Sequence, residues 1–151
     1  FPLVIAGAKG WLNSDIPPLL DSLGVKESVK FTGYIDGNDI SAVYSGASLF
    51  AYPSLYEGFG LPILEAMSCG APVITSNTSS MPEVAGDAAL LVDPLNAEEI
   101  AFAVETVIEK ESLRAEMKKK GLARAALFSW DRCARETIEV YRKVASSPKR
   151  S

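Results

Sequence analysis

Two glutamates, Glu57 and Glu65, flank the segment Gly-Phe-Gly-Leu-Pro-Ile-Leu, and this arrangement carries the clearest chemistry in the chain. A glycine loop that opens a helix presents free backbone amides and the positive end of the helix dipole, and both attract anions such as phosphate. Two carboxylates would repel a phosphate, but they can accept hydrogen bonds from hydroxyl groups at the two ends of a diphosphate. The pattern therefore indicates a nucleotide sugar as ligand.

The residues between the two glutamates fit this interpretation. We expect the amides of Phe59, Gly60 and Leu61 to point outward, and we expect Gly58 and Gly60 to allow close approach and unusual φ values. Pro62 suits the first helical position, where its missing N–H is not needed.

Each carboxylate also has a purely structural interpretation. A carboxylate such as Glu65 is favoured by the dipole when it lies in the first turn of a helix, and Glu57 alone is compatible with a solvated loop charge. The two carboxylates together with both glycines favour the functional interpretation.

The elements that must position this loop alternate between strands and helices. Strands are expected at 3–6, 29–32, 47–52, 72–75 and 89–92. Helices are expected at about 17–23, from 36 or 38 to 44, from 62 to a stop at Gly70, at 82–85, from 97 behind the cap Asn96, at 113–128 with a break near Gly121, and at 130–145 behind the cap Ser129.

This alternation predicts an α/β fold with a doubly wound, parallel, Rossmann-like sheet and helices on both faces. In such sheets ligands bind beyond the carboxyl ends of the strands. The loops at Gly7, Gly33, Glu57 and Ser76 all follow strand ends, so we expect them to converge on one cleft.

Composition narrows the function further. The chain has 151 residues, a formal net charge of −4 and no histidine. The length fits one domain, the charge argues against nucleic acid as a partner, and histidine-based nucleophilic catalysis is excluded. Cys69 and Cys133 are too few and too far apart to indicate a disulfide framework or a metal site. The apolar runs are too short to span a bilayer, which favours a cytoplasmic protein.

Several blocks of the sequence resemble the C-terminal, donor-binding domain of a retaining glycosyltransferase of family 4, with the GT-B architecture, and most closely its mannosyltransferase branch. These blocks are Phe31 to Tyr34, Tyr44 to Ala47, Pro53 to Pro62, Glu65 to Met67, Gly70 to Ser76, Pro82 to Val84, and Phe128 to Trp130. The central block carries the family's E-x7-E motif.

The resemblance implies that Glu57 is the catalytic residue, lying against the donor sugar, and that Glu65 grips the ribose hydroxyls. The other donor-binding residues that it implies are Gly33, Tyr34 and Ile35 beside the base, Gly58, Phe59, Gly60 and Leu61 beside the sugar and diphosphate, and Thr75, Ser76 and Glu83 elsewhere in the cleft. Glu83 also suits the first turn of a helix begun by Pro82. The resemblance also implies that no metal ion or other cofactor takes part, and that the nucleotide sugar is a substrate.

The chain also departs from the family pattern. Residues 1–151 would form one donor-binding domain that lacks the first strand, with its Arg and Lys, and the N-terminal acceptor domain. Lys9 is the only candidate to replace those cations. We expect this fragment to bind nucleotide weakly and to catalyse nothing. The last helix, around 136–144, would pack toward the missing domain, which would bring a glycan, lipid-linked or small-molecule acceptor.

The sequence is compatible with more than one donor and more than one class of protein. GDP-mannose is the favoured donor, with UDP-glucose or UDP-N-acetylglucosamine as alternatives. A dinucleotide-binding oxidoreductase shares the sheet, but the loop Gly7-Ala8-Lys9-Gly10-Trp11 lacks the G-x-G-x-x-G spacing. A non-catalytic nucleotide-binding module is the third interpretation. A peripheral position at the membrane is an alternative for the full-length protein.

Overall fold

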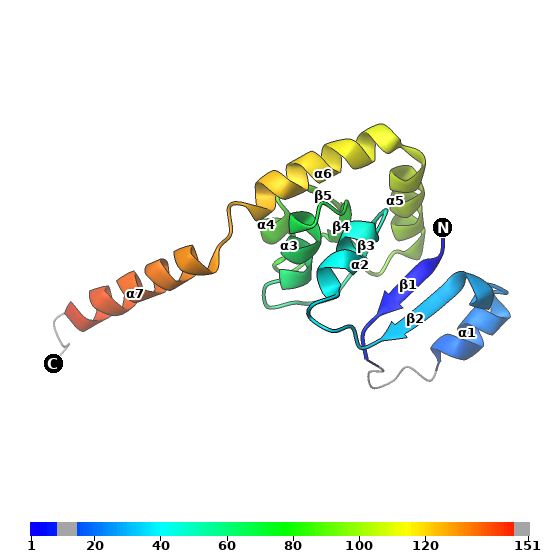
Figure 1. Cartoon of the computed structure of the whole chain (residues 1–151), viewed down its shortest axis with the longest axis horizontal. Coiled ribbons are helices and arrows are strands. Elements are labelled where there is room, and N and C mark those ends of the chain that lie inside the picture. Colours follow the sequence, from blue (N-terminus) through cyan, green and yellow to red (C-terminus); the bar gives the residue numbers. More distant parts are fainter. Residues whose placement is uncertain (9–14, 147–151) are drawn as a thin grey trace. The chain divides into compact units, whose positions relative to one another are not determined.

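The computed structural model describes residues 1–8 and 15–146, so Lys9 lies outside the described residues. The chain divides into two compact units, Phe1–Ala42 and Val43–Ser151. The strands pair in parallel within two separate sheets, one of two strands and one of three (Figure 1). The predicted α/β class and the parallel strands are confirmed, although the predicted single sheet is replaced by two.

The first unit is built on a parallel pair of strands. Its elements are β1 (Leu3–Ala6), α1 (Ile16–Ser22), the 3-10 helix η1 (Lys26–Ser28) and β2 (Val29–Gly33). At the carboxyl ends of the strands, the amide of Gly7 donates to the carbonyl of Gly33 at 3.0 Å. Gly24, which follows the C-cap Leu23 of α1, has φ +66°, as the predicted helix stop requires.

Residues 3–6 form the predicted strand, but the strand is not buried as a continuous apolar run such as Leu3 to Ala6 predicts. Leu3 and Val4 are 56% and 46% exposed. The sheet of this unit has only two strands, and α1 is short and buries only Leu20. β1 therefore lacks the layers of helices that cover a buried parallel strand on both faces.

The second unit carries the three-stranded sheet in the order β3-β4-β5. Its elements are β3 (Phe50–Tyr52), α3 (Leu61–Ser68), β4 (Val73–Ser76), α4 (Met81–Ala85), β5 (Ala89–Val92), α5 (Ala97–Glu109), α6 (Glu111–Ala125) and α7 (Trp130–Ser146), and α2 (Ile40–Gly46) runs into it from the first unit. Every strand pair is parallel.

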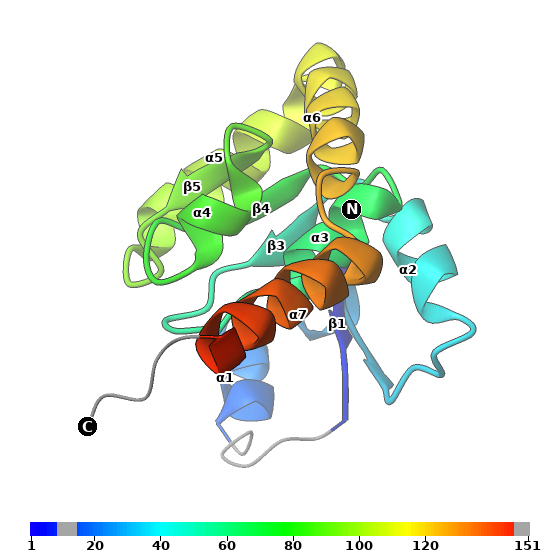
Figure 2. The ribbon, with the colours of Figure 1, turned by 90° about the vertical axis from the view of Figure 1, so that its left-hand side faces the viewer.

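The central strand β4 is buried along its whole length, from Val73 to Ser76. Ile74 joins Val92 and side chains of α5 and α6 in one apolar cluster. Because side chains alternate along a strand, Val73 faces the opposite side. α3 and α4 both contact β4, whereas α5 contacts β5 (Figure 2). This is the arrangement expected of a parallel strand covered on both faces.

α6 continues through Gly121 without a break, so the predicted break at this glycine is wrong. Gly121 is buried, and a Cβ at this position would lie 3.3 Å from Cγ of Met67 on α3. The glycine therefore allows α3 and α6 to approach closely, and it does not end the helix. The energetic cost of glycine in a helix is offset here by tertiary packing.

The predicted caps of α5 and α7 are confirmed. Asn96 Oδ1 accepts a hydrogen bond from the amide of Glu99 at 3.1 Å, and Ser129 Oγ accepts one from the amide of Arg132 at 3.1 Å. The Glu99 carboxylate does not complete a capping box, since it accepts from the amide of Asp93.

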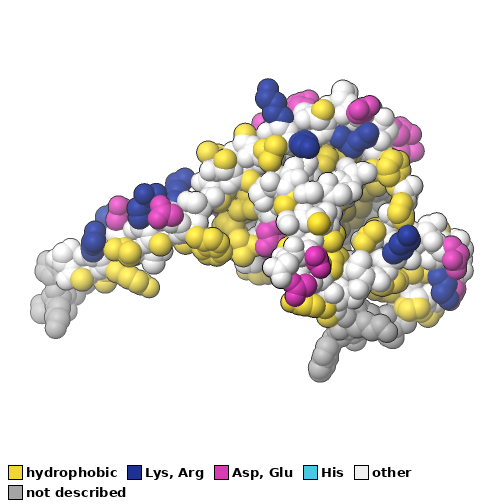
Figure 3. Space-filling view, in the orientation of Figure 1, with side chains coloured by type: hydrophobic (Ala, Val, Ile, Leu, Met, Phe, Trp, Pro, Cys, Tyr) yellow, Lys and Arg dark blue, Asp and Glu magenta, His cyan; other side chains and the backbone are white. Residues whose placement is uncertain are grey.

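α7 exposes an apolar face, as expected. Ile138, Val140, Tyr141 and Val144 are between 47% and 69% exposed, and hydrophobic side chains gather along this helix in Figure 3. Among the described helices, none is both long enough and apolar enough to cross a membrane.

Candidate functional site

The loop between Glu57 and Glu65 ends in a left-handed residue. Gly60 is the N-cap of α3, with φ +97° and ψ 43°, and a Cβ on it would lie 3.2 Å from Cδ1 of the buried Ile63. A residue with a side chain would be strained in this conformation. Gly58 differs, because a Cβ there would meet nothing within 4 Å and its φ is not positive. Of the two glycines, only Gly60 has the unusual φ expected from the sequence.

The amides of Phe59, Gly60 and Leu61 donate no hydrogen bond to any part of the chain that the structure describes. The first amides of a helix have no partner within the helix and need one from outside it. Pro62, the second residue of α3, has no N–H. Three consecutive amides at the start of α3 are therefore available to an acceptor that carries negative charge.

Glu57 is half-buried and held by two hydroxyl groups. Tyr52 Oη donates to Glu57 Oε1 at 2.5 Å, and Ser54 Oγ donates to the same oxygen at 3.1 Å. Both partners come from β3 or from the residues just after it. The carboxylate is thereby fixed at the carboxyl end of β3, where ligands bind in parallel sheets.

Glu65 is exposed and is the fifth residue of α3, beyond the first turn in which the structural interpretation placed it. Its Oε2 accepts a hydrogen bond from Tyr44 Oη at 3.1 Å. A favourable interaction with the helix dipole falls off within the first turn, so it does not account for a carboxylate at this position.

Burial raises the pKa of Tyr44, and the hydrogen bond that it donates to Glu65 raises it further. The pKa of Tyr52 is also raised, first by burial and then by its hydrogen bond to Glu57. Both phenols are therefore hydrogen-bond donors at neutral pH.

A second loop, from Ser76 to Ser80, supports the glycine loop through hydroxyl groups. Ser79 and Ser80 donate to the carbonyl of Glu57 at 2.7 and 3.0 Å, and Ser80 also donates to the carbonyl of Phe59 at 2.9 Å. Thr78 donates to the carbonyl of Leu55 at 3.3 Å. Of the four loops that were predicted to converge on one cleft, those at Glu57 and Ser76 meet, and those at Gly7 and Gly33 belong to the first unit.

Thr75 and Ser76, which the resemblance placed in the donor cleft, are fully buried. Thr75 Oγ1 donates to the carbonyl of Tyr52 at 2.9 Å, and Ser76 Oγ donates to the carbonyl of Ser54. In this structure their hydroxyls hold the backbone that carries Glu57.

An arginine and two phenylalanines connect the glycine loop to α4 and α6. The ring of Phe59 meets Phe128 edge to face, with centroids 6.1 Å apart, and the guanidinium of Arg124 lies 4.9 Å from the centre of Phe128. Arg124 also donates to the backbone carbonyls of Val84 and Glu83. The carboxylate of Glu83 lies in the first turn of α4, and the residue is exposed.

A groove of about 1000 Å³ opens between α3 and the start of α7. Residues that line it include Phe59, Leu61, Glu65, Phe128, Trp130 and Cys133. Glu57 is not among the described residues that form its walls, so the groove contains only one of the two carboxylates.

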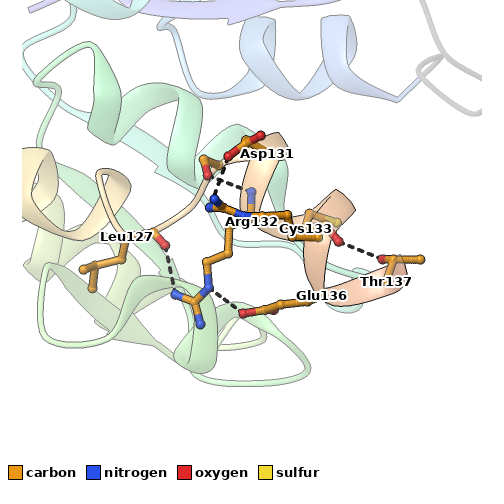
Figure 4. Close-up of polar contacts among 8 residues, drawn as sticks. Leu127, Asp131, Arg132, Cys133, Glu136 and Thr137 are labelled. Carbon is orange, nitrogen blue, oxygen red and sulfur yellow. Dashed lines mark hydrogen bonds and ion pairs between the residues drawn. The ribbon is translucent and has the colours of Figure 1, made fainter. Parts of the chain in front are cut away.

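The polar side chains at the start of α7 are engaged with one another (Figure 4). Arg132 Nε donates to Glu136 at 2.7 Å, and Arg132 also donates to the carbonyl of Leu127 at 3.4 Å. Thr137 Oγ1 donates to the carbonyl of Cys133 at 2.8 Å. These contacts stabilise the first turns of α7 and the chain that enters it.

Three predicted donor-binding residues, Gly33, Tyr34 and Ile35, belong to the first unit. Gly33 has φ +69°, Tyr34 is 78% exposed and Ile35 is half-buried. Their role beside a base stays a prediction. Among residues 1–8 and 15–146, no group of three or more His, Cys, Asp or Glu side chains could hold a metal ion.

The second unit is an α/β domain with a parallel sheet, and at the carboxyl end of β3 it combines two carboxylates with three helix-end amides that donate to no described part of the chain. In parallel α/β sheets ligands bind at this edge. Residues 1–124 match the family described as "Glycosyl transferases group 1". The chain belongs to this family, and the GT-B resemblance read from its motifs is confirmed.

Its relatives include the O-antigen chain mannosyltransferase B of Escherichia coli, which is 43% identical over 143 residues. The serotype-specific mannosyltransferase WbdA of the same organism is 39% identical over 130 residues. These matches cover 94% and 85% of this chain but only 37% and 16% of the relatives. The chain thus spans much less than the full length of either.

Solved structures give the same picture of the fold. Sucrose-phosphate synthase from Thermosynechococcus elongatus has a TM-score of 0.84 at 32% identity, over 96% of this chain and 39% of that one. Anabaena HepE, in complex with UDP-glucose, has a TM-score of 0.83 at 25% identity, over 94% of this chain and 41% of that one.

Proposed function

We propose that residues 1–151 form the donor-binding domain of a longer glycosyltransferase, which transfers a mannosyl group from GDP-mannose to a hydroxyl acceptor with retention of configuration. One observation carries the proposal. Three amides that donate to nothing in residues 1–8 and 15–146 lie at the start of α3, between two carboxylates that accept hydrogen bonds from tyrosines. This combination suits a diphosphate with a hydroxyl-bearing group on each side.

In this proposal the diphosphate accepts hydrogen bonds from the amides of Phe59, Gly60 and Leu61. Negative charge grows on the diphosphate as its bond to the sugar breaks, and amides that are already oriented stabilise that charge without reorganisation. The positive end of the α3 dipole adds to this effect. The expectation that no metal ion takes part belongs to the proposal and rests on the family resemblance.

The two carboxylates have separate roles. Glu57 accepts hydroxyls of the donor sugar and faces the reacting carbon, and Glu65 accepts the ribose hydroxyls. Oε1 of Glu57 and Oε2 of Glu65 already accept hydrogen bonds from the protein. The opposite oxygen of each carboxylate accepts none within the described chain, so each can receive a ligand hydroxyl.

The choice of mannose is supported by the mannosyltransferase relatives at 43% and 39% identity. A UDP-sugar is the alternative, which the likeness to the UDP-glucose complex of HepE favours. The acceptor would be bound through a further domain of the longer protein. A non-catalytic nucleotide-binding module remains a second interpretation. The proposal keeps a cytoplasmic location, with a peripheral position at the membrane as the alternative.

Titration of the 151-residue chain tests the binding step. We expect isothermal calorimetry to detect the binding of GDP, and tighter binding of GDP-mannose. UDP and NADH are titrated in parallel, because tighter binding of either would favour a UDP-sugar donor or a dinucleotide-binding domain instead. Glu65→Ala should weaken GDP by about 10- to 100-fold, the value of hydrogen bonds to a charged group. Glu105→Ala, an exposed glutamate of α5, is the matched control and should bind like the wild type.

Transfer can be measured in a chimera in which this chain replaces the matching segment of the O-antigen mannosyltransferase. We expect transfer by the chimera, and loss of transfer on Glu57→Ala or Glu65→Ala. Full activity in both variants would refute the assigned roles. A wild-type chimera that binds GDP-mannose but transfers nothing would favour the non-catalytic module.

A further inference from the structure

Three aromatic rings form a continuous column beneath the two carboxylates. Tyr44, at the end of α2, meets the ring of Phe50 edge to face, with centroids 5.2 Å apart and planes at 88°. Phe50 in turn stacks on Tyr52 at 5.8 Å, with planes at 17°. Both contacts have the geometry that aromatic pairs prefer. The column therefore joins α2 to the carboxyl end of β3.

Each end of this aromatic column holds one carboxylate of the pair. Tyr44 donates to Glu65 at 3.1 Å, and Tyr52 donates to Glu57 at 2.5 Å. The two glutamates are eight residues apart on a loop and a helix, whereas the two tyrosines come from other elements. The spacing of the carboxylates is thus linked to packing outside their own loop.

We propose that Tyr44 and Tyr52 are positioning residues that orient the two carboxylates toward the nucleotide sugar, and that Phe50 fixes the distance between them. This inference rests on the proposed function, because it assumes that Glu65 receives the ribose and Glu57 the sugar. The inference gives Tyr44, Phe50 and Tyr52 a role that the sequence alone did not indicate.

The physical reason is preorganisation. An exposed glutamate such as Glu65 samples many rotamers, and binding a ligand would cost side-chain entropy. A hydroxyl that donates to one carboxylate oxygen selects a rotamer before the ligand arrives and leaves the second oxygen free. Hydrogen bonds to charged groups are among the stronger ones in proteins, so one donor is enough to bias the side chain.

The two tyrosine hydroxyls that donate these hydrogen bonds are themselves held in place. Tyr44 is only 9% exposed, and its raised pKa keeps the hydroxyl protonated under any ordinary assay condition. Tyr52 is half-buried and belongs to a strand that is paired with β4 along its length. Neither phenol can swing away without breaking the ring contacts to Phe50.

The test compares two nucleotides that differ only in the group that Glu65 receives. GDP and 2′,3′-dideoxy-GDP are titrated into the wild type, Tyr44→Phe and the control Tyr141→Phe, an exposed tyrosine of α7. We expect Tyr44→Phe to weaken GDP about tenfold and to leave dideoxy-GDP unchanged, since its ribose offers Glu65 no hydroxyl. Tyr141→Phe should change neither affinity.

Tyr52 is tested by transfer in the chimera. We expect Tyr52→Phe to lower kcat about tenfold with little change in the affinity for GDP, because Glu57 faces the sugar and not the ribose. Thermal unfolding of each variant checks that it is folded. If Tyr44→Phe does not fold, the division between kcat and GDP affinity in Tyr52→Phe still tests the inference.

The possible outcomes separate the two hypotheses. If the wild type binds neither GDP nor UDP, both the proposed function and this inference are wrong. If the wild type binds GDP and Glu65→Ala abolishes the preference for GDP over dideoxy-GDP, but Tyr44→Phe does not alter that preference, only the inference fails. An equal loss of both nucleotides in Tyr44→Phe would also overturn it, because a purely structural role predicts that result.

Discussion

The two glycines of the loop between Glu57 and Glu65 differ in backbone conformation and in the space around them, although only one residue separates them. Gly60 has φ +97°, and a Cβ on it would lie 3.2 Å from the buried side chain of Ile63. Gly58 has open space around the same position and no positive φ. The pair Gly60→Ala and Gly58→Ala therefore adds the same methyl group under contrasting conditions.

The expected magnitudes follow from these geometries. An alanine forced into the left-handed region costs about 1–2 kcal/mol. The contact with Ile63 adds to that cost, because Ile63 is fully buried and its neighbours restrict its movement. Replacing glycine lowers the entropy of the unfolded chain, which returns about 0.4–1 kcal/mol in both variants. We expect Gly60→Ala to lose about 1–2 kcal/mol and Gly58→Ala to lose nothing or gain slightly.

Urea unfolding followed by circular dichroism measures both variants against the wild type. The free energies of unfolding should differ by about 2 kcal/mol between Gly58→Ala and Gly60→Ala, with similar m values. Equal stabilities would refute the reasoning, since they would mean that the backbone at Gly60 is neither left-handed nor crowded. A larger loss in Gly58→Ala would refute it as well.

Three further predictions concern the elements around the site. Asn96→Ala removes the N-cap of α5 and should cost about 1 kcal/mol in the free energy of unfolding by urea. Arg124→Met removes two hydrogen bonds to carbonyls of α4 and a charge over an aromatic ring, and should cost about 2 kcal/mol. Its control, Arg135→Met on exposed α7, should stay within about 0.5 kcal/mol. In the folded protein, burial and the hydrogen bond to Glu65 raise the pKa of Tyr44. Above about pH 10 a tyrosine in the unfolded chain ionises, whereas Tyr44 in the folded protein keeps its proton. Stability should therefore fall as the pH rises, and Tyr44→Phe should make the fall shallower in urea titrations across that range.

Each of these predictions can fail in a distinct way. An unchanged urea midpoint in Asn96→Ala would mean that the cap does not support α5. Equal losses in Arg124→Met and Arg135→Met would show that the contacts of the first arginine add nothing beyond a surface ion pair. Parallel pH profiles for the wild type and Tyr44→Phe would contradict the raised pKa.

Local signals in the sequence were sufficient where a feature depends on neighbouring residues. The strands at 3–6 and 89–92 were predicted with the boundaries that the structure has. The caps Asn96 and Ser129 were also right, because an N-cap accepts from an amide only two or three residues further on. The glycine loop before α3 was recognised for the same reason.

Features that depend on distant residues were missed or misread. Gly121 reads as a helix break in isolation, and only its contact with Met67, far away in the sequence, explains why α6 continues. Tyr44 lies 21 residues before the carboxylate that it holds, and no local pattern records that pairing. The run of hydroxyl residues from Ser76 to Ser80 was a visible signal for the second loop. Its targets could not be read from the sequence, because they are backbone carbonyls.

The glycine loop is held almost entirely through its carbonyl oxygens, which accept hydrogen bonds from the serines of the neighbouring loop. Such bonds fix a backbone but do not shield its amide hydrogens. Phe59 and Leu61, both 44% exposed, should therefore exchange rapidly with deuterated water even though their loop is well anchored, because exchange depends on the bonding and the solvent access of the amide itself. Slowed exchange at these two amides on addition of a nucleotide would then report direct contact with a ligand and not the ordering of a mobile segment.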